Sequence, residues 1–145
     1  MINQAVCASF MKELFEGVHN FGPAPDIFMF ALFTSSARLD GGTAVYDPFG
    51  EASGPEYIAG GEILSIRQAP VTQGPQVLLN FNDVLWPIGI AIIARGGLIY
   101  NSSKDNRAVS VFDFGLDINT ATSGKFGIRF PPNNIGINRA IMVMS

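Results

Sequence analysis

The feature that most constrains the fold is a succession of short apolar runs, each closed within a few positions by Gly, Pro, Asn or Asp. In 76–82 apolar and polar side chains alternate, and Val77, Leu79 and Phe81 are expected to point inward. Such alternation is typical of a strand with one buried face. No helical segment separates the runs beyond residue 62, which argues against a parallel sheet. The sequence therefore predicts an all-β, mainly antiparallel fold, a β-sandwich of jelly-roll or similar type with one short N-terminal helix.

The predicted strands fall into about eight segments. They are 26–33, 62–69, 76–82, 88–94, 98–100, 107–114, 125–130 and 140–144. Segment 26–33 is apolar on both faces, which is typical of a central strand that is covered on both sides. Pro70 is expected to end segment 62–69, and Gly96 and Gly97 are expected to separate two strands.

The N-terminal region predicts a short helix over about residues 4–17, because Val6, Phe10 and Leu14 recur every four positions. A helix of this kind covers one end of a sheet or docks on a neighbouring protein. The sequence has no internal repeat, linker or shift in composition. Residues 1–145 are therefore predicted to form a single domain.

A long loop over about residues 35–61 is rich in Gly and Pro, yet it carries the aromatic residues Tyr46, Phe49 and Tyr57. A connection of this length inside a compact domain is either functional or wrapped on a partner. A solvated loop does not need aromatic side chains. These three residues are therefore candidate protein-interface residues.

The other interface candidates are Trp86 and two methionines of the apolar end of the chain, Met142 and Met144. The single tryptophan has two interpretations. It either lies at the rim of the core with its N–H bonded to a loop carbonyl, or anchors a protein interface.

The composition limits the classes of partner. Charged residues make up 14% of the chain and hydrophobic residues 48%, so some apolar surface is expected to meet another protein. The alternative is a well-buried core covered by Ser, Thr, Asn and Gly. A net charge of −3 argues against nucleic-acid binding, and no apolar run is long enough to span a membrane.

Residues that carry chemistry are scarce. Cys7 and His19 are the only residues of their types, so neither a disulfide nor a Cys/His metal site is expected. Asp105, Asp113 and Asp117 lack the spacing of a calcium loop. There is no phosphate loop and no Gly-x-Ser-x-Gly motif. We therefore expect that the protein is not an enzyme and binds no cofactor. The alternative is an enzyme that uses a pair of carboxylates as acid and base, for which the sequence suggests no substrate.

Seven stretches spread over most of the chain together resemble a family of small tailed-bacteriophage virion structural proteins. They are NQAVCASF at 3–10, EGVHN at 16–20, ALFTSS at 31–36, TAVY at 43–46, YIAGG at 57–61, ARGGLIYN at 94–101 and FDFG at 112–115. Within that class the chain looks most like head decoration, or cement, proteins.

This resemblance implies a role on the capsid surface of the virion, after synthesis in the host cytoplasm. Decoration proteins bind the outside of the shell and bridge neighbouring copies of the major capsid protein, often as dimers or trimers. The resemblance carries over no catalytic residue and no cofactor. The alternatives from the residues are a tail, baseplate or fibre-base component and a carbohydrate-binding β-sandwich module.

Overall fold

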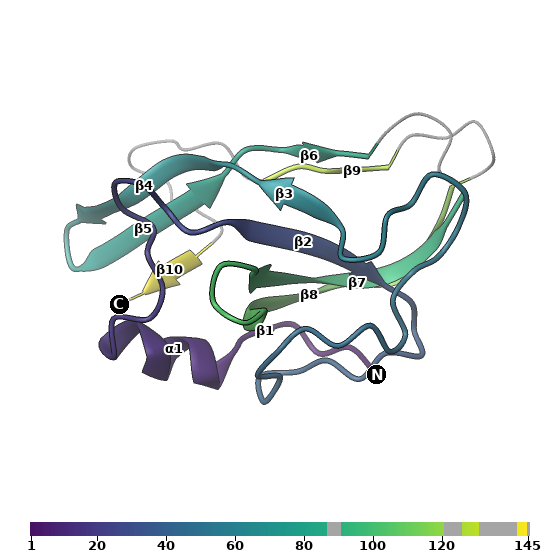
Figure 1. Ribbon diagram of the computed structural model, residues 1–145, viewed down its shortest axis with the longest axis horizontal. Helices are drawn as coiled ribbons and strands as arrows, with labels where there is room; N and C mark the ends of the chain where they lie inside the picture. Colours follow the sequence, from purple (N-terminus) through teal and green to yellow (C-terminus); the bar gives the residue numbers. More distant parts are fainter. Residues whose placement is uncertain (87–90, 121–125, 131–141, 145) are drawn as a thin grey trace.

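The computed structural model describes residues 1–86, 91–120, 126–130 and 142–144, which form ten strands and one helix (Figure 1). In chain order these are β1 (Ala5–Val6), α1 (Ala8–Phe15), β2 (Phe28–Phe33), β3 (Glu62–Leu64), β4 (Ile66–Gln73), β5 (Gln76–Phe81), β6 (Val84–Leu85), β7 (Ile93–Asn101), β8 (Arg107–Asn119), β9 (Gly127–Ile128) and β10 (Met142–Met144). The predicted residues 88–90, 125 and 140–141 lie outside the described ranges.

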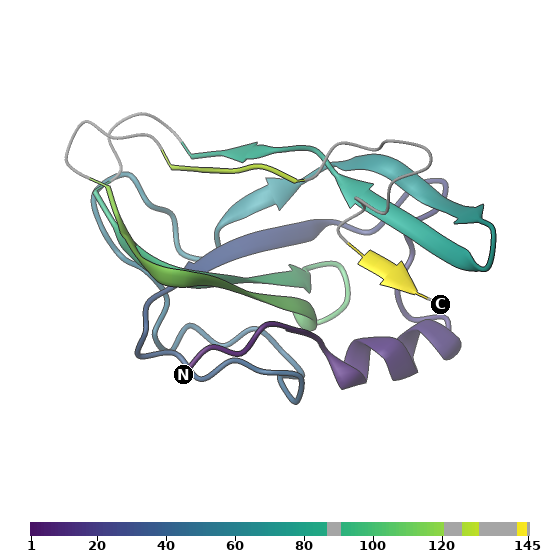
Figure 2. The same cartoon turned by 180° about the vertical axis from the view of Figure 1, so that it is seen from behind.

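The strands form a five-stranded sheet and two smaller sheets. The large sheet has the order β1-β8-β7-β2-β3, and the smaller ones are β10-β5-β4 and β6-β9. Every pairing between these strands is antiparallel. Only Ser65 separates β3 from β4, so one extended segment passes from the large sheet into a smaller one (Figures 1 and 2). The predicted all-β, mainly antiparallel, sandwich-like fold with one short helix is confirmed.

Strand β2 lies inside the large sheet and is covered on both faces, as predicted. Phe28 and Phe30 point to the face where the smaller sheets lie, because Phe28 packs on Phe81 of β5 and Phe30 packs on Trp86. Phe33 points to the opposite face and packs on Tyr46. The strand therefore needs apolar side chains on both faces.

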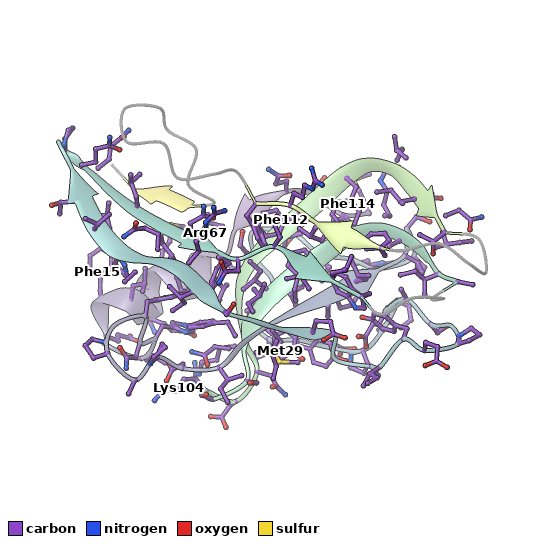
Figure 3. The ribbon with its side chains drawn as sticks, turned by 90° about the horizontal axis from the view of Figure 1, so that it is seen from above. Phe15, Met29, Arg67, Lys104, Phe112 and Phe114 are labelled. Carbon is purple, nitrogen blue, oxygen red and sulfur yellow. The ribbon has the colours of Figure 1, made fainter. Side chains whose placement is uncertain are left out.

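A chain of aromatic contacts runs through the core. Consecutive ring centroids are 4.4–6.2 Å apart along Phe10, Phe21, Phe28, Phe81, Phe130, Phe30, Trp86, Phe126 and Phe114. Phe112 and Phe114, two positions apart in β8, point to the same face of the sheet (Figure 3), where Phe112 packs on Phe30 and Phe114 on Phe126. The contacts link the helix, both layers and the segments that flank β6 and β9.

The two glycines expected to separate strands instead lie inside β7, so that prediction was wrong. A Cβ on Gly97 would overlap the ring of Phe30, and a Cβ on Gly96 would overlap the carbonyl oxygen of Phe112. Glycine is present here because neighbouring groups fill the space of a side chain, not because the chain turns.

Pro70 also lies inside a strand, β4, instead of ending it. Strand β4 is the edge of its sheet, and its pairing with β5 shifts register on both sides of Gln68. A proline is compatible with an edge strand that contains bulges, since its missing N–H then interrupts no regular ladder. In β5 Leu79 and Phe81 are buried as predicted, but Val77, towards the hairpin end, is exposed.

The helix is shorter than the predicted 4–17. Its first predicted turn is extended, because Ala5 and Val6 pair with β8 as β1 and the amide of Cys7 donates to Val109. Helix α1 therefore begins at Ala8.

Candidate functional site

The loop between β2 and β3, residues 34–61, is held to the sheet by a carboxylate. Glu51 accepts hydrogen bonds from the hydroxyls of Tyr46 (2.6 Å) and Tyr57 (2.9 Å) and from the amide of Gly60 (2.7 Å). One side chain thus joins three separate points of the same loop.

The tyrosines connect this loop to the strands. The Tyr57 hydroxyl accepts from the amide of Leu32 in β2, and the Tyr100 hydroxyl of β7 donates to the carbonyl of Gly60. Tyr46 stacks on Tyr100 with ring centroids 4.6 Å apart. Burial raises the pKa of Tyr46, Tyr57 and Tyr100, and the nearby Glu51 carboxylate raises each further.

The predicted interface residues of the loop therefore fall into two groups. Tyr46 and Tyr57 are partly buried, and their hydroxyls bond inside the protein. Phe49 is 69% exposed and Ile58, which the sequence analysis did not single out, is 71% exposed. That any of them contacts a partner stays a prediction; the two exposed side chains are the ones placed to do so.

The remaining interface candidates lie elsewhere. Trp86 is only 1% exposed and packs edge-on against Phe30 and Phe126, as the core interpretation predicted. Its indole N–H has no hydrogen-bond partner within the described ranges, so the expected bond to a loop carbonyl is not seen. Met142 and Met144 lie in β10, and the backbone of Met142 pairs with that of Leu79 in β5. The side chains of both methionines are outside the described part of the chain.

A buried polar cluster joins the helix to the large sheet. His19 lies between Glu13 of α1 (2.7 Å from Nε2) and Asn101 of β7 (3.0 Å from Nδ1). The Asn101 amide also donates to Asp26, and Arg107 donates to Glu13. Because the amide nitrogen is a donor, Nδ1 accepts and Nε2 carries the proton given to Glu13.

Hydrogen bonding sets the charge of this cluster. Burial alone would raise the pKa of Glu13, but the hydrogen bonds from His19 and Arg107 outweigh it and lower the pKa. The pKa of Asp26 is lowered in the same way, against burial, by Asn101 and the amide of Asn20. No sequence pattern indicates this cluster, because Glu13 and His19 meet Asn101 and Arg107 only in the folded chain.

Cys7 and His19, the single thiol and the single imidazole of the sequence, do not form a nucleophilic pair among the described residues. Cys7 is fully buried, and burial raises the pKa of its thiol to about 11. The bonds of His19 go to Glu13 and Asn101, and none to Cys7 appears within the described residues. Cys7 therefore packs as a small apolar side chain.

The three aspartates considered for calcium do not form a ligand set. The Asp113 carboxylate accepts hydrogen bonds from the amide of Gly115 and from Arg95. Both bonds lower the pKa of Asp113, and the bond from the amide has the larger effect. In the described ranges no group of three or more His, Cys, Asp or Glu side chains is placed to hold a metal ion.

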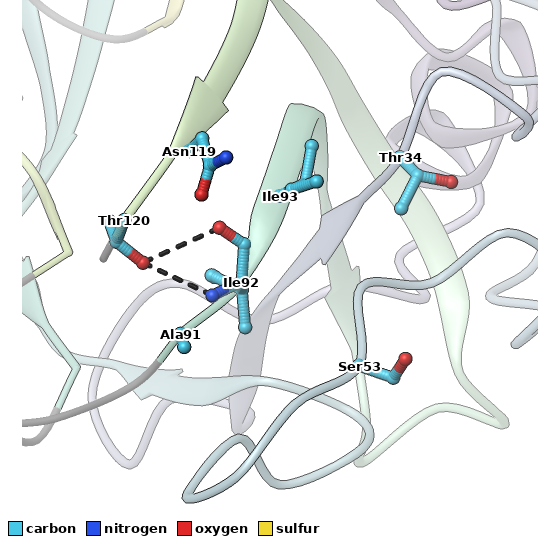
Figure 4. A pocket seen from close by; sticks show the side chains of 7 residues that line it. All are labelled: Thr34, Ser53, Ala91, Ile92, Ile93, Asn119 and Thr120. Atoms are coloured by element: carbon cyan, nitrogen blue, oxygen red, sulfur yellow. Dashed lines mark hydrogen bonds between the residues drawn. The ribbon is translucent and has the colours of Figure 1, made fainter. Parts of the chain in front are cut away.

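One surface hollow of about 390 Å³ opens where β7 and β8 approach the loop (Figure 4). Its lining is neutral and comprises Thr34, Ser53, Ala91, Ile92, Ile93, Asn119 and Thr120. The Thr120 hydroxyl already bonds to the backbone of Ile92. These lining residues supply no acid, base or activated nucleophile.

Comparison with known proteins adds no relative. No protein-family profile, curated protein or solved structure matches the chain. Within the described residues, α1 is too short to cross a bilayer.

Proposed function

We propose that this protein is a structural component of a tailed-bacteriophage virion. It binds the outside of the capsid and stabilises the shell by bridging neighbouring subunits of the major capsid protein. The resemblance of the sequence to decoration proteins suggests the setting, and the surface of the folded chain supports a docking role.

The observation that carries the proposal is the number of large apolar side chains left on the surface of a well-packed fold. Those more than 60% exposed are Met1, Phe15, Phe49, Ile58, Ile63, Leu85 and Leu116. These side chains do not contribute to the core, which is formed by other residues, among them the contacting aromatic side chains from Phe10 to Phe114. Exposed apolar side chains are typical of an interface where they lie together on one face, and the proposal is that a partner covers those of loop 34–61, Phe49 and Ile58.

The polar chemistry of the fold supports the same proposal. The described carboxylates with lowered pKa, Glu13, Asp26 and Asp113, are each engaged in hydrogen bonds within the protein. Glu51 is bonded to two tyrosines of its own loop. These groups hold segments together, which suits a rigid clamp better than a site for turnover.

The carbohydrate-binding alternative receives no comparable support. Sugar recognition by a β-sandwich needs exposed aromatic faces, whereas Trp86 is buried and the tyrosines pack against the sheet. The tail, baseplate or fibre-base alternative shares the docking surface and differs only in the partner.

Co-sedimentation with phage heads stripped of their minor proteins tests the proposal. Saturable binding at a fixed number of copies per capsomer, with a higher melting temperature of the heads, is the expected result. Absence of binding to both unexpanded and expanded heads would overturn the capsid role. Binding to purified tails instead would establish the tail alternative.

Loop variants sharpen this test. The double variant Phe49→Ser with Ile58→Ser removes the two most exposed of the large apolar side chains of loop 34–61 and is expected to weaken head binding strongly. Leu116→Ser removes a side chain of β8 that is 61% exposed and lies outside the loop, and it serves as the comparison. Equal effects of the two substitution sets would refute a docking surface on the loop.

A further inference from the structure

The outer face of α1 has the pattern of a helix that packs on another helix. The buried face carries Phe10 and Glu13. The exposed face is formed by Ala8, Met11, Lys12, Phe15 and Glu16, which are spaced three or four apart along the chain. Phe15 is 90% exposed at the outer end of the helix (Figure 3). An apolar stripe with this spacing is the seam through which helices pair.

The two charges beside this stripe are arranged for self-recognition. Lys12 and Glu16 lie one turn apart, with 3.0 Å between Nζ and Oε1. Two such helices paired antiparallel about a two-fold axis near positions 13–14, in the last turn of α1, bring Lys12 of each copy to Glu16 of the other. The same pairing brings Met11 towards Phe15. The face is therefore complementary to itself in charge.

Helix stability alone does not explain this order of charges. Glu16 is the C-cap residue of α1, where the negative end of the helix dipole disfavours a carboxylate. An ion pair in which Lys precedes Glu by four positions also stabilises a helix less than a pair in the reverse order.

We propose that α1 is a homodimerisation surface, through which a second copy of this chain pairs antiparallel with the first. Met11 and Phe15 supply the apolar contact, and Lys12 and Glu16 fix the register. This inference rests on the proposed function only in that a dimer would bridge two capsid sites.

The dimer is expected to be weak in solution. A helix of eight residues buries less area than the roughly 1,200 Å² of a stable interface. We expect a dissociation constant of about 10 µM to 1 mM. Copies held side by side on a shell would pair through their high effective concentration.

Sedimentation velocity over a concentration series up to about 1 mM tests the proposal with the full chain. Phe15→Ser is expected to weaken self-association about tenfold or more. Lys12→Glu and Glu16→Lys, each alone, are expected to weaken it because like charges then face each other. An equimolar mixture of these two charge variants restores opposite pairs and should associate at least as well as the wild type.

The mixture is the decisive measurement. All three side chains are exposed, so the variants should keep the circular dichroism spectrum of the wild type. A wild-type chain that stays monomeric throughout, or a mixture that associates no better than its components, would overturn the proposal. Head binding is measured separately, so failure of the dimer and failure of the capsid role are distinguishable.

Discussion

Glu51→Ala is expected to destabilise the protein because this carboxylate holds three points of loop 34–61 together. It removes the common acceptor of Tyr46, Tyr57 and the amide of Gly60. A hydrogen bond to a charged group contributes about 1.5–3 kcal/mol, so three independent bonds would sum to about 4.5–9 kcal/mol. Glu51 is only half-buried, so water can replace part of these hydrogen bonds. We therefore expect the free energy of unfolding to fall by about 3 kcal/mol.

Urea denaturation measures this loss directly, and the melting temperature should fall by about 10 °C. Glu51→Gln keeps one oxygen for Tyr57 and Gly60 and should cost only about 1–2 kcal/mol. Glu56→Ala makes the same substitution at an exposed position of the loop and should change the free energy of unfolding by less than about 0.5 kcal/mol. Equal effects of Glu51→Ala and Glu56→Ala would refute the role assigned to Glu51.

The same network predicts a loss of stability in alkali. The pKa values of the three tyrosines are raised in the folded protein. Their stabilising effect is therefore complete below the pKa of about 10 of an unfolded tyrosine and is lost as the pH rises above it. In Glu51→Ala this dependence should be weaker, which absorbance titration of the phenols and unfolding at several pH values would both detect.

Three further predictions concern the core. Gly97→Ala forces a methyl group against the ring of Phe30 and should cost about 3 kcal/mol in thermal unfolding, whereas Gly74→Ala, with open space but φ of +59°, should cost about 1 kcal/mol. Glu13 has a lowered pKa, so its stabilising effect is complete above about pH 4 and is lost as the pH falls further; Glu13→Gln should flatten that part of the stability profile. Cys7 should react with a thiol reagent only on unfolding, and rapid labelling of the native protein at neutral pH would contradict its burial.

Local patterns in the sequence were sufficient for the strands but not for the chemistry that joins them. The doubly apolar pattern of β2 and most of the alternation in β5 appear in the structure because each depends on which face of one strand is covered. Gly97 was misread because its reason is the ring of Phe30, which lies more than sixty positions away. Pro70 was misread because only the sheet order shows that β4 is an edge.

The candidate site illustrates the same limit. The aromatic residues of the long loop were singled out as interface candidates, but the sequence does not reveal that Tyr46 and Tyr57 face inward to Glu51. The buried cluster around His19 brings Glu13 and His19 together with Asn101, which lies more than eighty positions further along the chain. No spacing rule detects such a cluster, because its members meet only after the large sheet has formed.

The place of β2 inside the large sheet has a consequence for synthesis on the ribosome. Its partner β7 pairs Gly96 with Phe33 and Asn101 with Phe28, so β2 must wait for more than sixty further residues to be added. At about 5–20 residues per second the wait lasts on the order of 3–15 s. During this time the apolar segment Phe28–Phe33 has no sheet partner on that side. A nascent chain of this protein is therefore expected to depend on holding chaperones until β7 has emerged.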